Sequence, residues 1–259
     1  MNPHRKEVVR LIQSVGYRHD TYRLFSDFCE LAALSLSNAV DLRKREEREA
    51  RYLAIVKGYE REVVELFPRI FAEVVMGLEL EACDLLGGVF HDLELHNKQR
   101  GQFFTPFEVS RMMASMIVGD EAGARRRIEQ RGYLTACEPA VGAGAMVIAL
   151  ADVIRSMGIN YQRHLHVTAI DIDPRAVHMA YVQFSLLHIP AVVVVGNALT
   201  LEEREHWFTP AHVLGGWTGR LQRDSPSEPV EVEAVTAGAP TLPAARVFET
   251  PRAGQLTLF

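Results

Sequence analysis

Apolar residues recur every three or four positions through the first part of the chain, a spacing that predicts amphipathic helices. The clearest run comprises Val63, Val64, Phe67, Ile70, Phe71, Val74 and Val75. We therefore expect residues 1–98 to form an all-helical N-terminal region. Within it, residues 43–51 alternate in charge sign. Two interpretations of that segment stay open, a solvated helix face with ion pairs four residues apart or a contact with nucleic acid.

The pattern changes after residue 98, where short apolar runs alternate with helical spacing. Strands are predicted at residues 133–138, 166–172 and 191–195, and the third run is apolar throughout, as a buried parallel strand is. Asp173 and Pro174 are typical of the first residues of a helix. The order strand, helix, strand, helix, strand predicts the first half of a doubly wound α/β domain, which we place at residues 99–221.

A further helix is expected after Thr105, before the first strand. Thr105 is suited to cap it, Pro106 to be its first residue, and Glu108 to complete a capping box. One stripe of this helix is apolar, and we expect the stripe to be part of the core; it comprises Val109, Met112, Met113, Met116 and Ile117.

Composition is that of a globular protein, with 259 residues, 48% hydrophobic and 24% charged. The chain has no apolar run long enough for a membrane span and no apolar secretory signal at its start. Cys29, Cys83 and Cys137 are far apart and lack zinc-ligand spacing, so we expect a cytoplasmic protein with no metal site. Residues 222–259, rich in Pro, Ala, Glu and Thr, predict a flexible tail.

Candidate chemistry follows the predicted strand ends. Gly142 and Gly144 follow the first strand, and glycines there let a ligand approach the backbone and the free N–H groups of the next helix. Two glycines alone are also typical of a tight structural turn. Asp171, at the end of the second strand, can accept both hydroxyls of a ribose, and Asn197, after the third, can hydrogen-bond an adenine edge. Together they indicate an adenosine-containing ligand at the strand ends.

The loop distinguishes between two such ligands. A dinucleotide fingerprint needs a third glycine, but Val147 occupies that position. Glu138, just before the loop, would repel a pyrophosphate and suits the ammonium group of a methionine. These residues favour S-adenosylmethionine as the cofactor.

Two segments in this order resemble a known family. Residues 101–106 read GQFFTP and residues 138–144 read EPAVGAG, which together resemble the modification subunit of type I restriction-modification systems, an adenine-N6 DNA methyltransferase. Residues 84–91 are also similar to the helix that precedes GQFFTP in that family. The resemblance implies a Rossmann-like methyltransferase core. The cofactor residues expected from the sequence and the resemblance together are Gln102, Phe103, Phe104, Thr105 and Pro106 over the methionine end, with Glu138, Pro139, Gly142, Gly144, Asp171 and Asn197.

The sequence departs from the family at the catalytic motif. The family has Asn or Asp, then Pro-Pro, then an aromatic residue after its fourth strand, where they bind the amine and stack on a flipped adenine. No Pro-Pro pair occurs in this sequence, and residues 203–212 stand in its place. Trp207 or Phe208 stacking on a base is one interpretation; a helix and loop packed on the sheet is the other. The sequence therefore predicts a truncated methyltransferase core, and no catalytic residue is assigned.

The net charge of −5 bears on DNA binding, because phosphate contacts usually require a basic surface. Binding to DNA would need a local basic patch or a partner, which the resemblance implies is a specificity subunit or a second methyltransferase chain. The candidate contacts are Lys98, Arg100, Arg125, Arg126 and Arg127. A solvated helix face is the alternative for the three consecutive arginines.

The last five residues resemble the peptide by which bacterial proteins dock on the DNA sliding clamp. Gln255, Leu256, Leu258 and Phe259 carry the resemblance, with two apolar anchors at the end. A chance match, or a tail that packs back on its own domain, is the alternative. The leading hypothesis is thus an S-adenosylmethionine-binding DNA adenine-N6 methyltransferase. A non-catalytic scaffold that docks through its tail is the second hypothesis, and a methyltransferase acting on RNA or a small molecule is the third.

Overall fold

The computed structural model describes residues 2–95, 105–223 and 255–257. Several residues expected to bind cofactor, DNA or a partner lie outside these ranges: Lys98, Arg100, Gln102, Phe103, Phe104, Leu258 and Phe259. Most of the expected tail, residues 224–254, also lies outside them.

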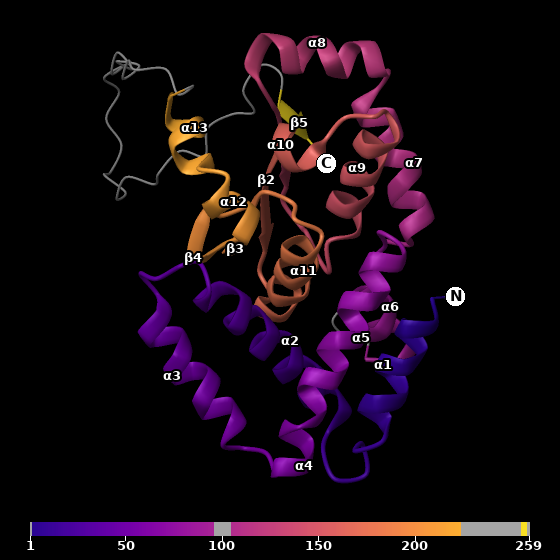
Figure 1. Ribbon diagram of the computed structural model, residues 1–259, viewed down its shortest axis with the longest axis vertical. Coiled ribbons are helices and arrows are strands. Elements are labelled where there is room, and N and C mark those ends of the chain that lie inside the picture. The colour runs from indigo at the N-terminus through magenta and orange to yellow at the C-terminus, as the bar shows by residue number, and fades with distance from the viewer. Residues whose placement is uncertain (1, 96–104, 224–254, 258–259) are drawn as a thin grey trace, which may run out of the picture.

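The N-terminal region is helical, as its apolar spacing predicts. Its helices are α1 (Pro3–Gln13), α2 (Thr21–Asn38), α3 (Arg45–Val56), α4 (Arg61–Val64), α5 (Leu66–Leu80) and α6 (Leu85–Asp92). Helices α1, α5 and α6 pack on one another, and α2 packs against α11 (Pro174–Leu186) of the α/β part. Figure 1 shows α11 between α2 and the sheet, so the helical region is packed directly on the core that carries the strands.

Three parallel strands form the centre of the sheet where the sequence predicts them. They are β1 (Leu134–Glu138), β2 (Leu165–Asp171) and β3 (Ala191–Asn197), in the order β3-β2-β1. Helices α9 (Ala145–Ser156) and α10 (Tyr161–His164) connect β1 to β2, and α11 connects β2 to β3. Residues 145–154 of α9 are all buried, which explains why that helix is apolar on nearly every side. Asp173 caps α11 by accepting the N–H of Arg175 at 3.1 Å, as expected.

One sheet edge differs from the sequence prediction. Residues 202–208 form β4 (Glu202–Phe208), antiparallel to β3, where a helix and loop were expected. The strand is hard to see in the sequence because it is an edge strand, with Glu202, Glu203 and Arg204 exposed to solvent. Helices α12 (Pro210–Leu214) and α13 (Trp217–Arg223) follow, and α13 continues two residues past the expected domain boundary.

The aromatic residues of β4 are used in packing. Trp207 is fully buried against His178 and Tyr181 of α11. The interpretation that Trp207 stacks on a target base is therefore wrong, since its ring is enclosed in the core. Phe208 is half-buried, with its ring centroid 5.0 Å from that of His212.

Residues from the end of the chain occupy the opposite sheet edge. Gln255–Thr257 form β5, which pairs in parallel with β1 so that Thr257 lies opposite Cys137. The full sheet order is β4-β3-β2-β1-β5. In a doubly wound sheet the position beside the first strand belongs to the fourth. This pairing is the arrangement in which the tail packs back on its own domain.

Helices α7 (Phe107–Val118) and α8 (Glu121–Arg131) lead into β1 and correct two expectations. Pro106 is the N-cap of α7 and no side chain caps the helix, so the Thr105 capping box does not form. The expected core stripe is divided, because Met113 and Ile117 pack on the core whereas Val109, Met112 and Met116 are exposed. The residues of α7 that are fully or almost fully buried are Ser110, Ala114 and Val118, small side chains that let α7 approach α9 closely.

The charged segment at residues 43–51 is only partly a solvated face. Most of it is exposed on α3, but Arg48 is 3% exposed and its guanidinium donates to Asp41 Oδ2 at 2.8 Å and to the His206 carbonyl at 3.0 Å. Arg51 pairs with Glu30 and Glu205. These arginines bind α3 to α2 and β4, so their charges stabilise the protein's own fold.

Candidate functional site

The carboxyl ends of β1, β2 and β3 bring the three strand-end residues to one edge of the sheet. Glu138 ends β1, Asp171 ends β2 and Asn197 ends β3. Glu138 lies opposite Ala169 in the β1–β2 register, and Asp171 lies opposite Val195, two residues before Asn197. The spacing in sequence predicted this convergence, because the carboxyl ends of neighbouring parallel strands point the same way.

Glu138 is a buried carboxylate with one oxygen unused. It is 1% exposed, and its Oε1 accepts the N–H of Ala140 at 3.0 Å. Among the described residues, Oε2 has no hydrogen-bond partner. Burial, opposed by the hydrogen bond from Ala140 and aided by the nearby charge of Asp171, raises the pKa of Glu138 from its usual 4.5 to about 7. A buried carboxylate in this state is poised to accept a cationic or N–H donor.

The glycine loop requires glycine at two positions. Gly142 has φ 55° and Gly144 has φ 106°, both in the region that favours glycine. A Cβ on Gly144 would also lie 2.6 Å from the ring of Phe184 on α11. Gly144 directly precedes α9, so the loop presents backbone at the start of that helix.

Asp171 holds the loop in place. Its Oδ2 accepts the N–H of Gly142 at 2.9 Å, and its Oδ1 accepts the N–H of Asp173 at 2.9 Å. Burial raises the pKa of Asp171, while the two backbone hydrogen bonds oppose the shift. Each carboxylate oxygen keeps a further lone pair, so Asp171 can accept a pair of hydroxyls while it keeps its hydrogen bonds to Gly142 and Asp173.

Asn197 offers a donor rather than an acceptor. Its Oδ1 accepts the N–H groups of Leu199 at 2.9 Å and Thr200 at 3.3 Å, which fixes the turn after β3. The Nδ2 group has no hydrogen-bond partner in the described part of the chain. It can therefore donate to a ring nitrogen of an adenine.

Two residues that hold this edge together were not found by sequence reasoning. Arg204 of β4 donates to the carbonyl of Ile172, the residue after Asp171, at 2.9 Å. It lies at a register shift opposite Val195 and Gly196, which no sequence signal marks. Gln183 of α11 is fully buried and donates to the carbonyl of Ala143, within the glycine loop, at 2.7 Å. In the sequence, Gln183 could have been recognised as a polar residue at a core position of an otherwise apolar helix.

Other described candidates lie just before α7 and on α8. Thr105 and Pro106 are exposed just before α7. Arg125 pairs with Glu121 and donates to the Met157 carbonyl, and Arg127 donates to the Val118 carbonyl. Helix α8 runs into the amino end of β1, so its last turn lies at the end of the strand opposite to Glu138.

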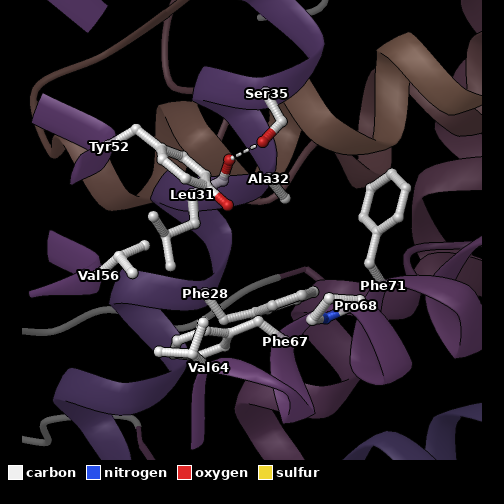
Figure 2. Close-up of a pocket in the computed structure, with 10 residues that line it drawn as sticks. All are labelled: Phe28, Leu31, Ala32, Ser35, Tyr52, Val56, Val64, Phe67, Pro68 and Phe71. Carbon is white, nitrogen blue, oxygen red and sulfur yellow. Dashed lines mark hydrogen bonds between the residues drawn. The ribbon is translucent and has the colours of Figure 1, made fainter. Parts of the chain in front are cut away.

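A separate apolar hollow of about 220 Å³ lies in the helical region. Figure 2 shows its walls, formed by side chains of α2 to α5 that include Phe28, Tyr52 and Phe67. The hydroxyl of Ser35 donates to the Leu31 carbonyl and so is already used. The lining carries no carboxylate or amide side chain, and the hollow is distinct from the strand-end site.

Within residues 2–95, 105–223 and 255–257, no group of three metal-ligating side chains is close enough to hold a metal ion. In the same part of the chain, no helix combines the length and apolarity needed to cross a membrane.

The strand-end residues fit S-adenosylmethionine. The unused Glu138 oxygen suits an ammonium group, the Asp171 carboxylate suits a ribose diol, and the Asn197 amide suits an adenine. A pyrophosphate would instead face the two carboxylates, Glu138 and Asp171, at the strand ends. The donor and acceptor set therefore favours a cofactor with a cationic amino-acid end.

Comparison with known proteins yields a family match and a distantly similar structure. A crystal structure from Listeria monocytogenes, described as a class I S-adenosylmethionine-dependent methyltransferase, is similar with a TM-score of 0.43 and 14% sequence identity. The similarity covers 77% of this chain and 55% of that one, so this chain spans about half of that protein's length. No curated protein matches the sequence. The N-6 DNA Methylase family model matches residues 85–214, half of the 259 residues and all three strand-end positions. The chain belongs to the N-6 DNA methylase family, and its cofactor is S-adenosylmethionine.

Proposed function

We propose that the chain binds S-adenosylmethionine across the carboxyl ends of β1, β2 and β3 for methyl transfer to the N6 amine of adenine in DNA. Glu138 binds the ammonium group, Asp171 the ribose hydroxyls, and Asn197 donates to the adenine of the cofactor. Backbone of the Gly142–Gly144 loop lies against the methionine moiety. The remaining residues, which the family resemblance contributes, are Gln102, Phe103, Phe104, Thr105, Pro106 and Pro139.

The observation that carries this proposal is the unpartnered Oε2 of Glu138. A buried carboxylate oxygen without a hydrogen bond costs free energy unless a ligand supplies a donor. An ammonium group supplies three donors and a compensating charge. The free energy lost by burying Glu138 in the cofactor-free protein is thus recovered when the cofactor binds.

The reaction places different demands on the cofactor and on the chain. Bound S-adenosylmethionine would supply an electrophilic methyl group, whose transfer to the adenine amine would break its bond to sulfur and release S-adenosylhomocysteine and a proton. The chain orients the cofactor and excludes water from its methionine end, while the target adenine is turned out of the duplex. Because the 259 residues contain no Pro-Pro motif to bind the amine, a specificity subunit or second methyltransferase chain completes the DNA site in this proposal.

Calorimetric titration with S-adenosylmethionine tests the cofactor site, with Asp171→Ala as the variant. Removing this carboxylate deletes the ribose acceptor and the hydrogen bond to Gly142, so binding should weaken at least ~100-fold. Asp120→Ala is the matched control, because Asp120 also accepts a backbone N–H but caps α8 instead. Equal affinities in the two variants would refute the site.

The second candidate function is a cofactor-binding scaffold without methyl transfer. It is favoured by the absence of a Pro-Pro motif from the 259 residues, and docking would require Gln255–Thr257 to leave their pairing with β1. In this proposal the tail docks on a replication partner such as the DNA sliding clamp. Transfer of labelled methyl groups to DNA, alone and with partner chains, separates an enzyme from a scaffold.

A further inference from the structure

Gln183 connects two parts of the chain that are remote in sequence. Its Nε2 donates to Asp84 Oδ1 at 2.9 Å and to the Ala143 carbonyl at 2.7 Å, and its Oε1 accepts the N–H of Leu86 at 3.0 Å. The side chain is fully buried. Both amide hydrogens are used, one on each side, so the side chain has a single orientation that satisfies all three bonds.

On one side, Gln183 binds the start of α6. Asp84 is the N-cap of this helix and also accepts the N–H of Gly87 at 2.9 Å. Leu86 is in the first turn, where backbone N–H groups need partners from outside the helix. Helix α6 is in turn joined to α1 by a two-bond ion pair between Arg5 and Asp92, with distances of 2.7 and 2.5 Å. Gln183 thus holds a helix that is itself fixed to the N-terminal region.

On the other side, Gln183 binds the glycine loop. The Ala143 carbonyl lies between the two glycines of positive φ, Gly142 and Gly144. The N–H of Gly142 is held by Asp171 from β2, and the carbonyl of the next residue is held by Gln183 from α11. Neighbouring backbone groups of the loop are therefore fixed by side chains from two different elements.

We propose that Gln183 is a positioning residue that couples helix α6 to the glycine loop. Through it, the helical region fixes the backbone conformation of the loop against which S-adenosylmethionine binds. Gln183 acts through the Ala143 carbonyl and does not touch the cofactor. The inference rests on the proposed cofactor site and extends it to the N-terminal helices. A residue that only fills the core between α11 and α6 would affect the stability of the fold without a separate effect on cofactor affinity.

The first comparison uses Gln183→Met against Tyr181→Phe. Gln183→Met keeps the length of the side chain and removes all three hydrogen bonds. Tyr181→Phe removes another bond of α11, from its hydroxyl to the Phe208 carbonyl at 3.1 Å, away from the loop. Gln183→Met should bind S-adenosylmethionine at least ~10-fold more weakly in calorimetry, and Tyr181→Phe within ~2-fold of the unmodified chain. Urea unfolding of both variants shows that each is folded.

The second comparison separates the two sides of the amide. In Asp84→Asn with Gln183→Glu, the asparagine amide can turn its Nδ2 to donate to the glutamate, and the glutamate can accept from Leu86. The donor to Ala143 stays missing. The double variant should therefore recover the unfolding midpoint relative to Gln183→Glu alone but remain at least ~10-fold weak in cofactor affinity. Recovery of both properties together would show that Gln183 only packs α6, and the proposal would be wrong.

Hydrogen exchange of the cofactor-free chain gives a readout that does not depend on binding. Gln183→Met should speed exchange in both α6 and residues 139–144, whereas the double variant should speed it only in the loop. Unchanged loop exchange in both variants overturns the coupling. Absence of cofactor binding in the unmodified chain would refute the proposed cofactor site instead, while the exchange result still decides whether Gln183 couples the two segments.

Discussion

The guanidinium of Arg48 lies 4.3 Å from the centroid of the Trp207 ring, which joins the N-terminal helices to the edge strand of the sheet. Arg48 also donates to Ser37 and Asp41 near the end of α2 and to the carbonyl of His206 on β4. One buried cation on α3 thus joins the end of α2 to β4, which is remote in the sequence. The α/β part and the helical part are therefore expected to unfold together.

Replacing Arg48 by Ala should lower the free energy of unfolding by about 3 kcal/mol, because it leaves Asp41 without its buried partner and opens a space over Trp207. Urea unfolding measures this loss. Arg45→Ala, on the exposed face of the same helix, should change the free energy by less than ~0.5 kcal/mol. A loss below ~1 kcal/mol for Arg48→Ala would contradict the coupling role.

The buried carboxyl of Glu138 should make the cofactor-free chain less stable as pH rises. Its folded pKa of about 7 exceeds the usual 4.5, so the favourable contribution of the neutral form is complete below pH 4.5 and is lost as pH rises through 7. Urea unfolding at pH 5.5 and 8 should show a fall of about 1–3 kcal/mol in the native chain relative to Glu138→Gln. Parallel pH profiles of the two proteins would rule out this titration.

Cofactor affinity should change with pH in the opposite direction. The ammonium group pairs with ionised Glu138, so affinity for S-adenosylmethionine should rise between pH 6 and 8, about 10-fold if binding requires the carboxylate. Calorimetry at several pH values measures the rise and the accompanying proton release. Glu138→Gln should bind more weakly with little pH dependence; a variant that retained the full pH dependence would assign it to another group.

Arg204 should affect how tightly the adenosine end of the cofactor is bound. Arg204→Met removes the hydrogen bond to the Ile172 carbonyl beside Asp171, so binding should weaken about 5-fold for S-adenosylmethionine and for S-adenosylhomocysteine alike. The equal loss is expected because both ligands share the adenosine. Arg61→Met, an exposed arginine on α4, is the control. A loss confined to S-adenosylmethionine would place the effect at the sulfur instead.

The β5 pairing can be tested by deleting residues 255–259. Loss of the three-residue pairing should speed amide exchange within Thr135–Cys137 and lower the free energy of unfolding by about 1 kcal/mol. Addition of a sliding clamp to the full chain should produce the same faster exchange if the tail leaves β1 to dock. Unchanged exchange after the deletion would mean that Gln255–Thr257 do not protect β1.

Sequence patterns were most informative where one local rule fixes both the structure and the residue type. The valines of β3 are apolar because a central parallel strand is buried on both faces, and Asp173 caps α11 through its own backbone neighbours. Glu138 and Asp171 could be assigned to one edge because each ends a parallel strand. For β4 no such rule applied, since an edge strand exposes its charges to solvent.

By itself, the sequence determined the three parallel strands, the order of the strand-end residues and the nature of the cofactor, all of which follow from short segments. Only the tertiary structure decided that Arg48 is buried, that Met112 and Met116 face outward, and that Gln183 holds the glycine loop. Each of those outcomes depends on which face of a helix meets a partner from another part of the chain. Local periodicity gives the helix but not the partner, because packing between remote segments selects the buried face.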